Sequence, residues 1–165
     1  MKDIYRRSFT LIEIIIVIGI IAIFSALSMG YYNTYTEEKK LDGEEKKIID
    51  IIELARKKAQ SGDIGGYSCS NFDGYQVVFA GDTYYLRICC ADGCSSTFTL
   101  QSYKLPQNIT ATISGSPTIS FSPLNFHTNL TTTVTITVKN AKISKCIPIA
   151  IYPSGLVDEG VKAAC

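Results

Sequence analysis

The 165-residue sequence lacks the motifs that mark most enzyme classes. It contains no phosphate-binding loop, no dinucleotide-binding glycine motif and no HExxH zinc motif. Its single histidine, His127, lies in a threonine- and asparagine-rich stretch without an Asp, Glu or Cys within a few residues. Because a lone histidine in such a stretch is usually a polar surface residue, we predict no catalytic residue, no enzyme activity and no cofactor. A Ser-His-Asp or Cys-His set assembled across the fold is the alternative that the sequence leaves open.

The sequence also lacks an excess of charge of either sign. Lys and Arg number 16, Asp and Glu number 15, and the formal net charge is +1. Without such an excess, no overall electrostatic field attracts the protein to nucleic acid or to an anionic membrane surface. A charged partner would have to be bound by a local patch of side chains.

Proline is absent between Phe9 and Ser61, which favours one long helix of about 50 residues, or roughly 80 Å. The first part, residues 9–30, is predominantly apolar, has Glu13 as its single ionisable side chain and is about as long as a helix must be to cross a bilayer. Basic residues dominate before this segment, whereas acidic and basic residues balance after it. We therefore expect the amino terminus in the cytoplasm and everything after about residue 36 outside.

Glu13 is an acidic side chain in this apolar segment, where it costs about 2.5–3.5 kcal/mol on insertion scales and is a functional candidate. Residues 8–13 have the sequence SFTLIE, between a short basic leader and an isoleucine-rich run. This stretch closely resembles the class III signal of type IV pilins and pseudopilins. The resemblance implies that prepilin peptidase cuts between Ser8 and Phe9, that the new amine of Phe9 is methylated, and that Glu13 pairs with a neighbouring subunit's amine during assembly. A carboxylate and an ammonium, each costly alone in hydrocarbon, would then set the register between subunits.

One position departs from the family pattern, which usually has glycine where this chain has Ser8. Serine is also small, so we expect the peptidase to accept it. The alternative is an uncut membrane anchor whose Glu13 reaches the interface or pairs without specificity.

Residues 31–61 are predicted to form the amphipathic half of the helix. Apolar residues recur at steps of three, four and seven along one stripe that should cover a globular core: Leu41, Ile48, Ile52, Ala55 and Ala59. Charged residues are expected on the other faces of this half: Glu44, Lys47, Arg56 and Lys57.

Residues 62–165 are predicted to form a β-rich head, because Thr, Ser, Tyr, Val and Ile dominate this part. Gly81-Asp82 is a two-residue hairpin signal, and the alternation of apolar residues with threonine over 131–138 predicts a strand with one buried face. The predicted strands cover residues 75–80, 83–90, 97–105, 109–113, 118–122, 130–139 and 143–152. The expected fold class is α+β, with a long helix packed on an antiparallel head, as in the pilin fold.

The expected division of the chain is a basic leader (1–8), an apolar half-helix (9–30), an amphipathic half-helix (31–61) and an extracytoplasmic head (62–165). Three stretches in the later parts resemble the GspH/FimT group of minor pseudopilins, the last of them more weakly: residues 52–59, 149–157 and 119–124.

The family resemblance implies a single-pass subunit of the inner membrane that assembles into a type IV pilus or a type II secretion pseudopilus. Its expected partners are other pilin or pseudopilin subunits, prepilin peptidase and the inner-membrane assembly platform. The alternative without assembly is an unprocessed, membrane-anchored β domain with an unknown ligand.

Six cysteines lie beyond the apolar segment, where an oxidising compartment would let them pair: Cys69, Cys89, Cys90, Cys94, Cys146 and Cys165. Six cysteines allow fifteen connectivities. The pilin resemblance favours Cys146 with Cys165 as a carboxy-terminal disulfide. Strand alternation puts Cys89 and Cys90 on opposite faces, so we expect them to take different partners, Cys69 and Cys94. A site of four thiolates is the alternative, but no CxxC pair supports a metal.

Nucleic-acid binding is the second function that the sequence raises, because some pilus subunits of this kind take up DNA. Four lysines are candidate DNA contacts: Lys139, Lys142, Lys145 and Lys162. The acidic pair Asp158 and Glu159 follows the glycine near the carboxyl terminus, where DNA-binding members of the FimT type would have arginines. We therefore predict that these lysines belong to a solvated turn.

Overall fold

The computed structural model describes residues 9–124 and 127–165. The chain forms two compact units, the first ending at Thr36 and the second comprising Glu37–Cys165. One helix, α1 (Leu11–Ser61), contributes to both units. It is a single element of 51 residues, which confirms the helix predicted from the absence of proline. The sequence-based division of the helix at residue 30 stays a prediction.

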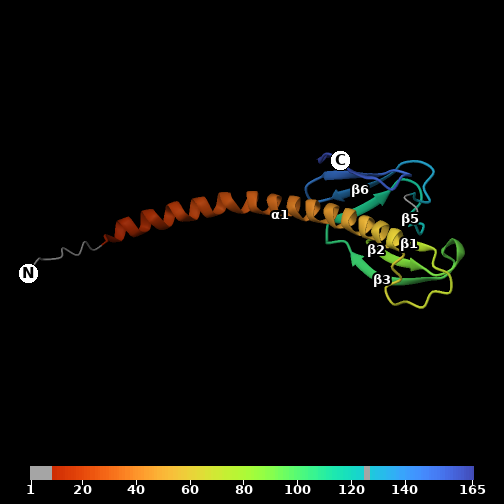
Figure 1. The fold of residues 1–165 in the computed structure, drawn as a ribbon. Helices are drawn as coiled ribbons and strands as arrows, with labels where there is room; N and C mark the ends of the chain where they lie inside the picture. The colour runs from red at the N-terminus through yellow and green to blue at the C-terminus, as the bar shows by residue number, and fades with distance from the viewer. Residues whose placement is uncertain (1–8, 125–126) are drawn as a thin grey trace, which may run out of the picture. The chain divides into compact units, whose positions relative to one another are not determined.

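The second unit contains two antiparallel sheets, and its α1 segment lies beside β1 (Gly74–Ala80) and β2 (Thr83–Cys89) (Figure 1). The first sheet has the strand order β3-β2-β1-β5 and the second β4-β6-β7-β8, with β9 paired to β7. The strands are β1 (Gly74–Ala80), β2 (Thr83–Cys89), β3 (Thr97–Lys104), β4 (Ile109–Ile113), β5 (Thr118–Phe121), β6 (Val134–Asn140), β7 (Lys145–Ile151), β8 (Val157–Glu159) and β9 (Ala163–Ala164). This arrangement confirms the predicted fold class.

The predicted hairpin joins β1 to β2. Ala80 pairs with Thr83, so Gly81 and Asp82 form the two-residue turn between them. Gly81 has a φ of 65°, the left-handed conformation that such a turn requires and that glycine adopts without steric cost.

The core of the second unit is one cluster of apolar side chains from α1 and both sheets. The predicted stripe on α1 is confirmed, because each of its members is fully buried: Leu41, Ile48, Ile52, Ala55 and Ala59. The predicted alternation in β6 is also confirmed. Val134, Ile136 and Val138 are buried, whereas Thr135 and Thr137 between them are only partly covered.

One strand bound and one exposed residue were predicted wrongly, and two strands were missed. The strand predicted over 130–139 begins only at Val134, because residues 131–132 form a bend before it. The strands β8 and β9 were not predicted, since three and two residues are too few for a period to be recognised. Glu44, expected on an exposed face of α1, is only 9% exposed, and its carboxylate pairs with Lys47 at 3.4 Å.

Candidate assembly site on the helix

The first turn of α1 is capped by the side chain of Thr10. Its Oγ1 atom accepts a hydrogen bond from the backbone N–H of Glu13 at 3.3 Å, and its carbonyl accepts one from Ile14 N–H at 3.3 Å. The Thr10 side chain therefore satisfies one of the otherwise unpaired backbone donors at the helix start, that of Glu13. Glu13 lies in the first turn, where the helix dipole favours a negative charge. Threonine three residues before glutamate is a capping-box pattern, a signal that our sequence analysis missed.

The first half of α1 exposes apolar side chains on every side in the single chain. The exposed residues are Phe9, Leu11, Ile12, Ile14, Ile15, Ile16, Val17, Ile18, Ile20, Ile21, Ile23 and Phe24, with fractions between 46% for Val17 and 78% for Leu11. A helix that is apolar around its whole circumference is stable only where something other than water surrounds it. These residues are not covered by the chain itself.

The structure describes two of the three site residues predicted at this end, Phe9 and Glu13. Phe9 is 74% exposed, and Glu13 is exposed as well. Ser8 and the leader lie outside the described residues. The processing site and the pairing role of Glu13 therefore stay predictions. Within the ranges 9–124 and 127–165, no helix has both the length and the apolar character that crossing a membrane requires.

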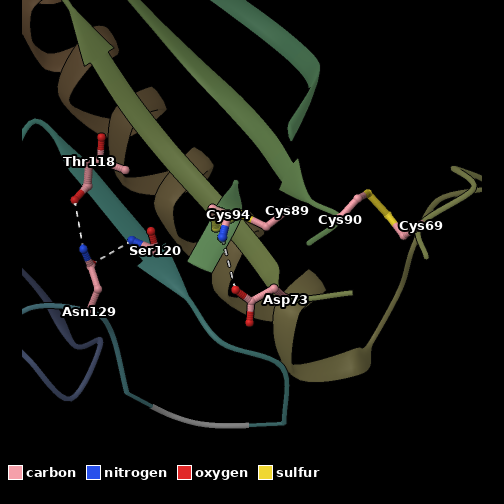
Figure 2. Close-up of a disulfide and its surroundings, with 8 residues drawn as sticks. All are labelled: Cys69, Asp73, Cys89, Cys90, Cys94, Thr118, Ser120 and Asn129. Carbon is pink, nitrogen blue, oxygen red and sulfur yellow. Dashed lines mark hydrogen bonds between the residues drawn. A yellow bond between two sulfur atoms is a disulfide. The ribbon is translucent and has the colours of Figure 1, made fainter. Parts of the chain in front are cut away.

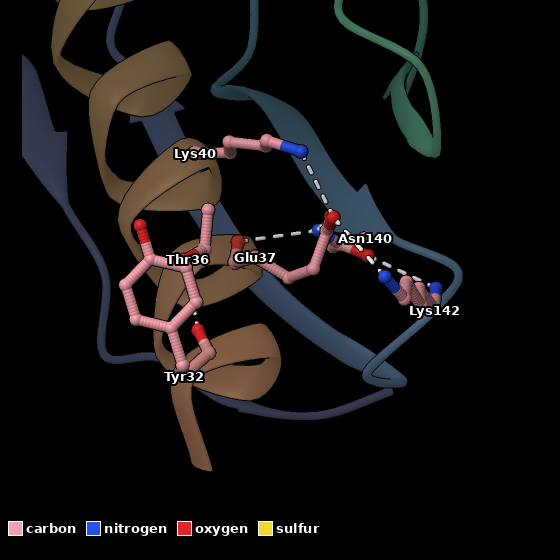
Figure 3. A network of polar contacts seen from close by, with 6 residues as sticks. All are labelled: Tyr32, Thr36, Glu37, Lys40, Asn140 and Lys142. Carbon is pink, nitrogen blue, oxygen red and sulfur yellow. Dashed lines mark hydrogen bonds and ion pairs between the residues drawn. The ribbon is translucent and has the colours of Figure 1, made fainter. Parts of the chain in front are cut away.

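At the start of the second unit, Glu37 is the centre of a polar network (Figure 3). Asn140, at the end of β6, donates from Nδ2 to the Glu37 carboxylate at 3.0 Å and to its carbonyl at 3.2 Å. Lys40 and Lys142 approach the same carboxylate at 2.9 and 3.5 Å. The bonds from Asn140 and Lys40 lower the pKa of Glu37 to about 2. Glu37 and Asn140 are both buried, so this network fastens β6 to α1.

Three of the four candidate DNA-contacting lysines pair with carboxylates of α1. Lys142 pairs with Glu37, and Lys145 approaches Glu38 at 2.6 Å. Lys162 approaches Asp42 at 2.5 Å and Glu38 at 4.0 Å. Lys139 is exposed on β6. These ion pairs neutralise most of the basic cluster, which weighs against a DNA surface there.

The sequence did not lead us to predict that carboxylates of α1 pair with these lysines. Glu38 and Asp42 are four residues apart along the helix, a spacing that brings their side chains together, whereas Glu37 precedes Glu38 by one residue and does not face it. The spacing could have indicated an acidic face. Nothing in it indicated that the three lysines, more than a hundred residues later, would return to that face.

All six cysteines form disulfides, and two of these bonds lie close together (Figure 2). Cys89 and Cys90 take different partners, as predicted: Cys90 pairs with Cys69, and Cys89 pairs with Cys94. The Cys94 N–H also donates to Asp73 at 3.2 Å. Cys146 pairs with Cys165, the connection that the pilin resemblance favoured.

The disulfides leave no thiolate for the alternative metal site, because no cysteine is free. Elsewhere in the described part of the chain, no group of three or more His, Cys, Asp or Glu side chains could hold a metal ion. His127 is exposed between β5 and β6.

Comparisons with known proteins give one match to the amino-terminal segment and one match to the overall fold. The family model of the prokaryotic N-terminal methylation motif matches residues 5–29. Among solved structures, the type IV minor pilin FimU of Pseudomonas aeruginosa has a TM-score of 0.58 and 16% sequence identity. The match covers 77% of this chain and 92% of that chain. No curated protein matches the sequence significantly.

The fold is that of a pilin: a long amino-terminal helix packed on an antiparallel β-rich head. The motif and the fold together support a type IV pilin-like family, as the sequence predicted. Pilins are structural subunits and not enzymes, which agrees with the prediction of no catalytic role. The finer resemblance to the GspH/FimT group stays a prediction.

Proposed function

We propose that this chain is a structural subunit, a minor pilin or pseudopilin, of a type IV pilus or a type II secretion pseudopilus. One observation carries the proposal: the methylation motif lies at the start of a helix whose first half exposes apolar side chains on every side. Such a helix gains most by being buried among copies of itself or in a bilayer. The function is then polymerisation, without chemistry performed by the chain.

Assembly would begin with removal of residues 1–8 by prepilin peptidase. The cut between Ser8 and Phe9 would leave the new amine one residue before the Thr10 cap, and methylation would follow at Phe9. The Glu13 carboxylate would then form an ion pair with the amino-terminal ammonium of a neighbouring subunit, in an environment without water. Each charge is costly there without the other, so the pair would fix how far one helix is displaced along the next.

Before assembly, the subunit would be held in the inner membrane with its amino terminus in the cytoplasm. The methylation motif supports this location, because type IV pilins are membrane-anchored before they enter the filament. The assembly platform of the inner membrane would extract the subunit. The head would remain on the periplasmic or extracellular side, an oxidising compartment that suits its three disulfides.

A minor role in the filament is favoured over a major one. FimU, whose fold this chain shares, is a type IV minor pilin. The resemblance of residues 52–59 and 149–157 to the GspH/FimT group supports the same assignment.

The processing step is tested by the intact mass and the amino-terminal sequence of the protein recovered from membranes. The proposal predicts a chain that begins at a methylated Phe9. A Ser8→Gly variant is the matched control, because it restores the residue usual in the family and should be processed at least as fast. If the wild type keeps its leader while Ser8→Gly loses it, this chain is not a natural substrate of the peptidase and the proposal fails.

A further inference from the structure

A cavity of about 470 Å³ lies between α1 and the carboxyl-terminal strands of the second unit. Its volume is within the range of pockets that bind small organic molecules. Three acidic residues line it, Asp42 and Glu45 from α1 and Glu159 from β8. The proposed assembly function assigns no role to this space, which we call the α1–β8 cavity.

Glu45 is buried, and no described group donates a hydrogen bond to its Oε1 atom. The residue is only 2% exposed, so bulk water does not replace the missing donor. Glu159 lines the same cavity, but an ionised carboxylate can only accept hydrogen bonds. A buried carboxylate is costly in such a position until a donor reaches it.

The lysines that line the cavity do not supply this donor. Lys39 and Lys162 both approach Asp42, at 3.8 and 2.5 Å. Lys46 is exposed and follows Glu45 directly on α1, where consecutive side chains do not face each other. Among the described residues, Asp42 therefore has cationic partners, whereas the buried oxygen of Glu45 has none.

Two glycines shape the walls of the cavity. Gly43 lies inside α1, where glycine is less favourable than alanine. Apart from its neighbours on the helix, no described atom lies within 4 Å of the position that a Cβ atom would take there. Beside β8, a Cβ atom on Gly160 would lie 2.5 Å from the Pro148 carbonyl oxygen, which accepts a hydrogen bond from Gly160 N–H at 2.8 Å. One wall therefore carries no side chain at Gly43, and the other is held against β7.

We propose that the α1–β8 cavity binds an organic cation whose ammonium or guanidinium group donates hydrogen bonds to the Glu45 carboxylate, with Glu159 as a second negative group. Ammonium and guanidinium groups combine several N–H donors with a positive charge, which is what a buried, unpaired carboxylate requires. No three acidic side chains of the described chain are grouped as a metal ion needs, so the cation is an organic one. Its source is a free polyamine or the side chain of a lysine or arginine in another protein.

Nuclear magnetic resonance of the isotope-labelled full chain in detergent tests the site. The reporters are the backbone amides of Gly43 and Gly160, which line the cavity, and the Gly81 amide in the β1–β2 turn is the internal control. Burial raises the pKa of Glu45 to about 7, so the titrations are made at pH 8.0, where most of this carboxyl is ionised. We expect added cation to shift the two reporter signals until they saturate, while the Gly81 signal stays in place.

Two probes distinguish the two sources of the cation. The probes are spermidine and a tripeptide of one arginine between two glycines, blocked at both ends. Binding of the tripeptide shows that a side chain of another protein can reach the site, whereas binding of spermidine alone assigns the site to a free amine. If neither probe shifts the signals of Gly43 and Gly160, the proposal is wrong.

Two variants and one control identify the carboxylate that binds the probe. Glu45→Gln keeps nearly the same shape but removes the buried charge, so the dissociation constant should rise at least about tenfold. Glu159→Gln, at an exposed position, should raise it by a smaller factor and provides the test if Glu45→Gln does not fold. Glu53→Gln removes the same charge from α1 away from the cavity and should bind as the wild type does. Wild-type affinity in every folded cavity variant would overturn the proposal.

Discussion

The two compact units of this chain differ in whether they bury their own apolar side chains. In the second unit, the helix buries Leu41, Ile48 and Ile52 against two sheets of the same chain. In the first unit, the same helix leaves residues such as Ile12 and Ile15 more than half exposed. The second unit therefore contains its own core, whereas the first unit requires a partner or a lipid environment. One helix thus supports the core of the head at its carboxyl end and, under the proposed function, association at its amino end.

Truncating an apolar side chain should have very different effects on stability in the two units, and this is the largest difference that we expect. Ile52→Ala removes a fully buried side chain and should lower the free energy of unfolding of the head by about 2–5 kcal/mol. Ile15→Ala, on the same helix but 59% exposed, should leave the head's stability unchanged. Thermal unfolding followed by near-ultraviolet circular dichroism of the head's tyrosines measures both. Equal losses in the two variants would contradict the division.

Removing the carboxy-terminal disulfide should have the next largest effect on the head. Cys146 and Cys165 are 19 residues apart, and closing a loop of that size stabilises a fold by about 3 kcal/mol on the loop-entropy model. The double variant Cys146→Ser/Cys165→Ser should unfold at a lower denaturant concentration than the wild type. The wild type after reduction is a poor control, because all three disulfides would open. An unchanged midpoint in the double variant would show that the terminus contributes nothing to stability.

Acid should weaken the attachment of β6 to α1. The pKa of Glu37 is lowered to about 2, so its bonds to Asn140 and Lys40 stabilise the head above the ordinary value of 4.5. This stabilisation is lost as the pH falls from about 4.5 through 2. Asn140→Ala removes the largest cause of the shift, so the difference in melting temperature between pH 5 and pH 2 should become smaller.

Gln107→Ala, which removes an exposed amide, is the control for Asn140→Ala. It should keep the full wild-type difference between the two pH values. If Asn140→Ala keeps that difference as well, Glu37 is not the group that titrates.

The smallest expected effect concerns the helix cap. Thr10→Ala removes the side chain that accepts from Glu13 N–H, and such a loss typically costs about 1 kcal/mol. The result should be fraying of the first turn of α1, measured as faster hydrogen exchange at the Glu13 amide. Thr10→Ser, which keeps the hydroxyl, should exchange at the wild-type rate. Fraying in both variants would assign the effect to the lost methyl group and not to the cap.

Periodic features of the fold could be predicted from the sequence, because apolar residues that recur at a helix or strand period indicate which face of that element is buried. The stripe from Leu41 to Ala59 and the alternation around Ile136 each average over several residues, and the structure confirms both. The strand β4 has the predicted bounds for the same reason.

The remainder depended on contacts between distant residues. Glu44 was expected in solvent because glutamate usually is, yet it is buried near Tyr84, whose pKa is raised by burial and by that neighbouring charge. The attachment of Lys142, Lys145 and Lys162 to α1 likewise arises only when β6 and β7 return to the helix. No local pattern encodes such encounters, so they were missed.

The most direct test of the central claim is incorporation of Glu13→Val into filaments sheared from cells, beside the matched variant Glu53→Val. Both replace an exposed glutamate of α1 with valine, but Glu53 lies in the second unit, where it pairs with Lys57 at 3.3 Å. The account predicts that Glu13→Val is absent from filaments although present in membranes, while Glu53→Val is incorporated as the wild type is. Incorporation of Glu13→Val at the wild-type level would contradict it.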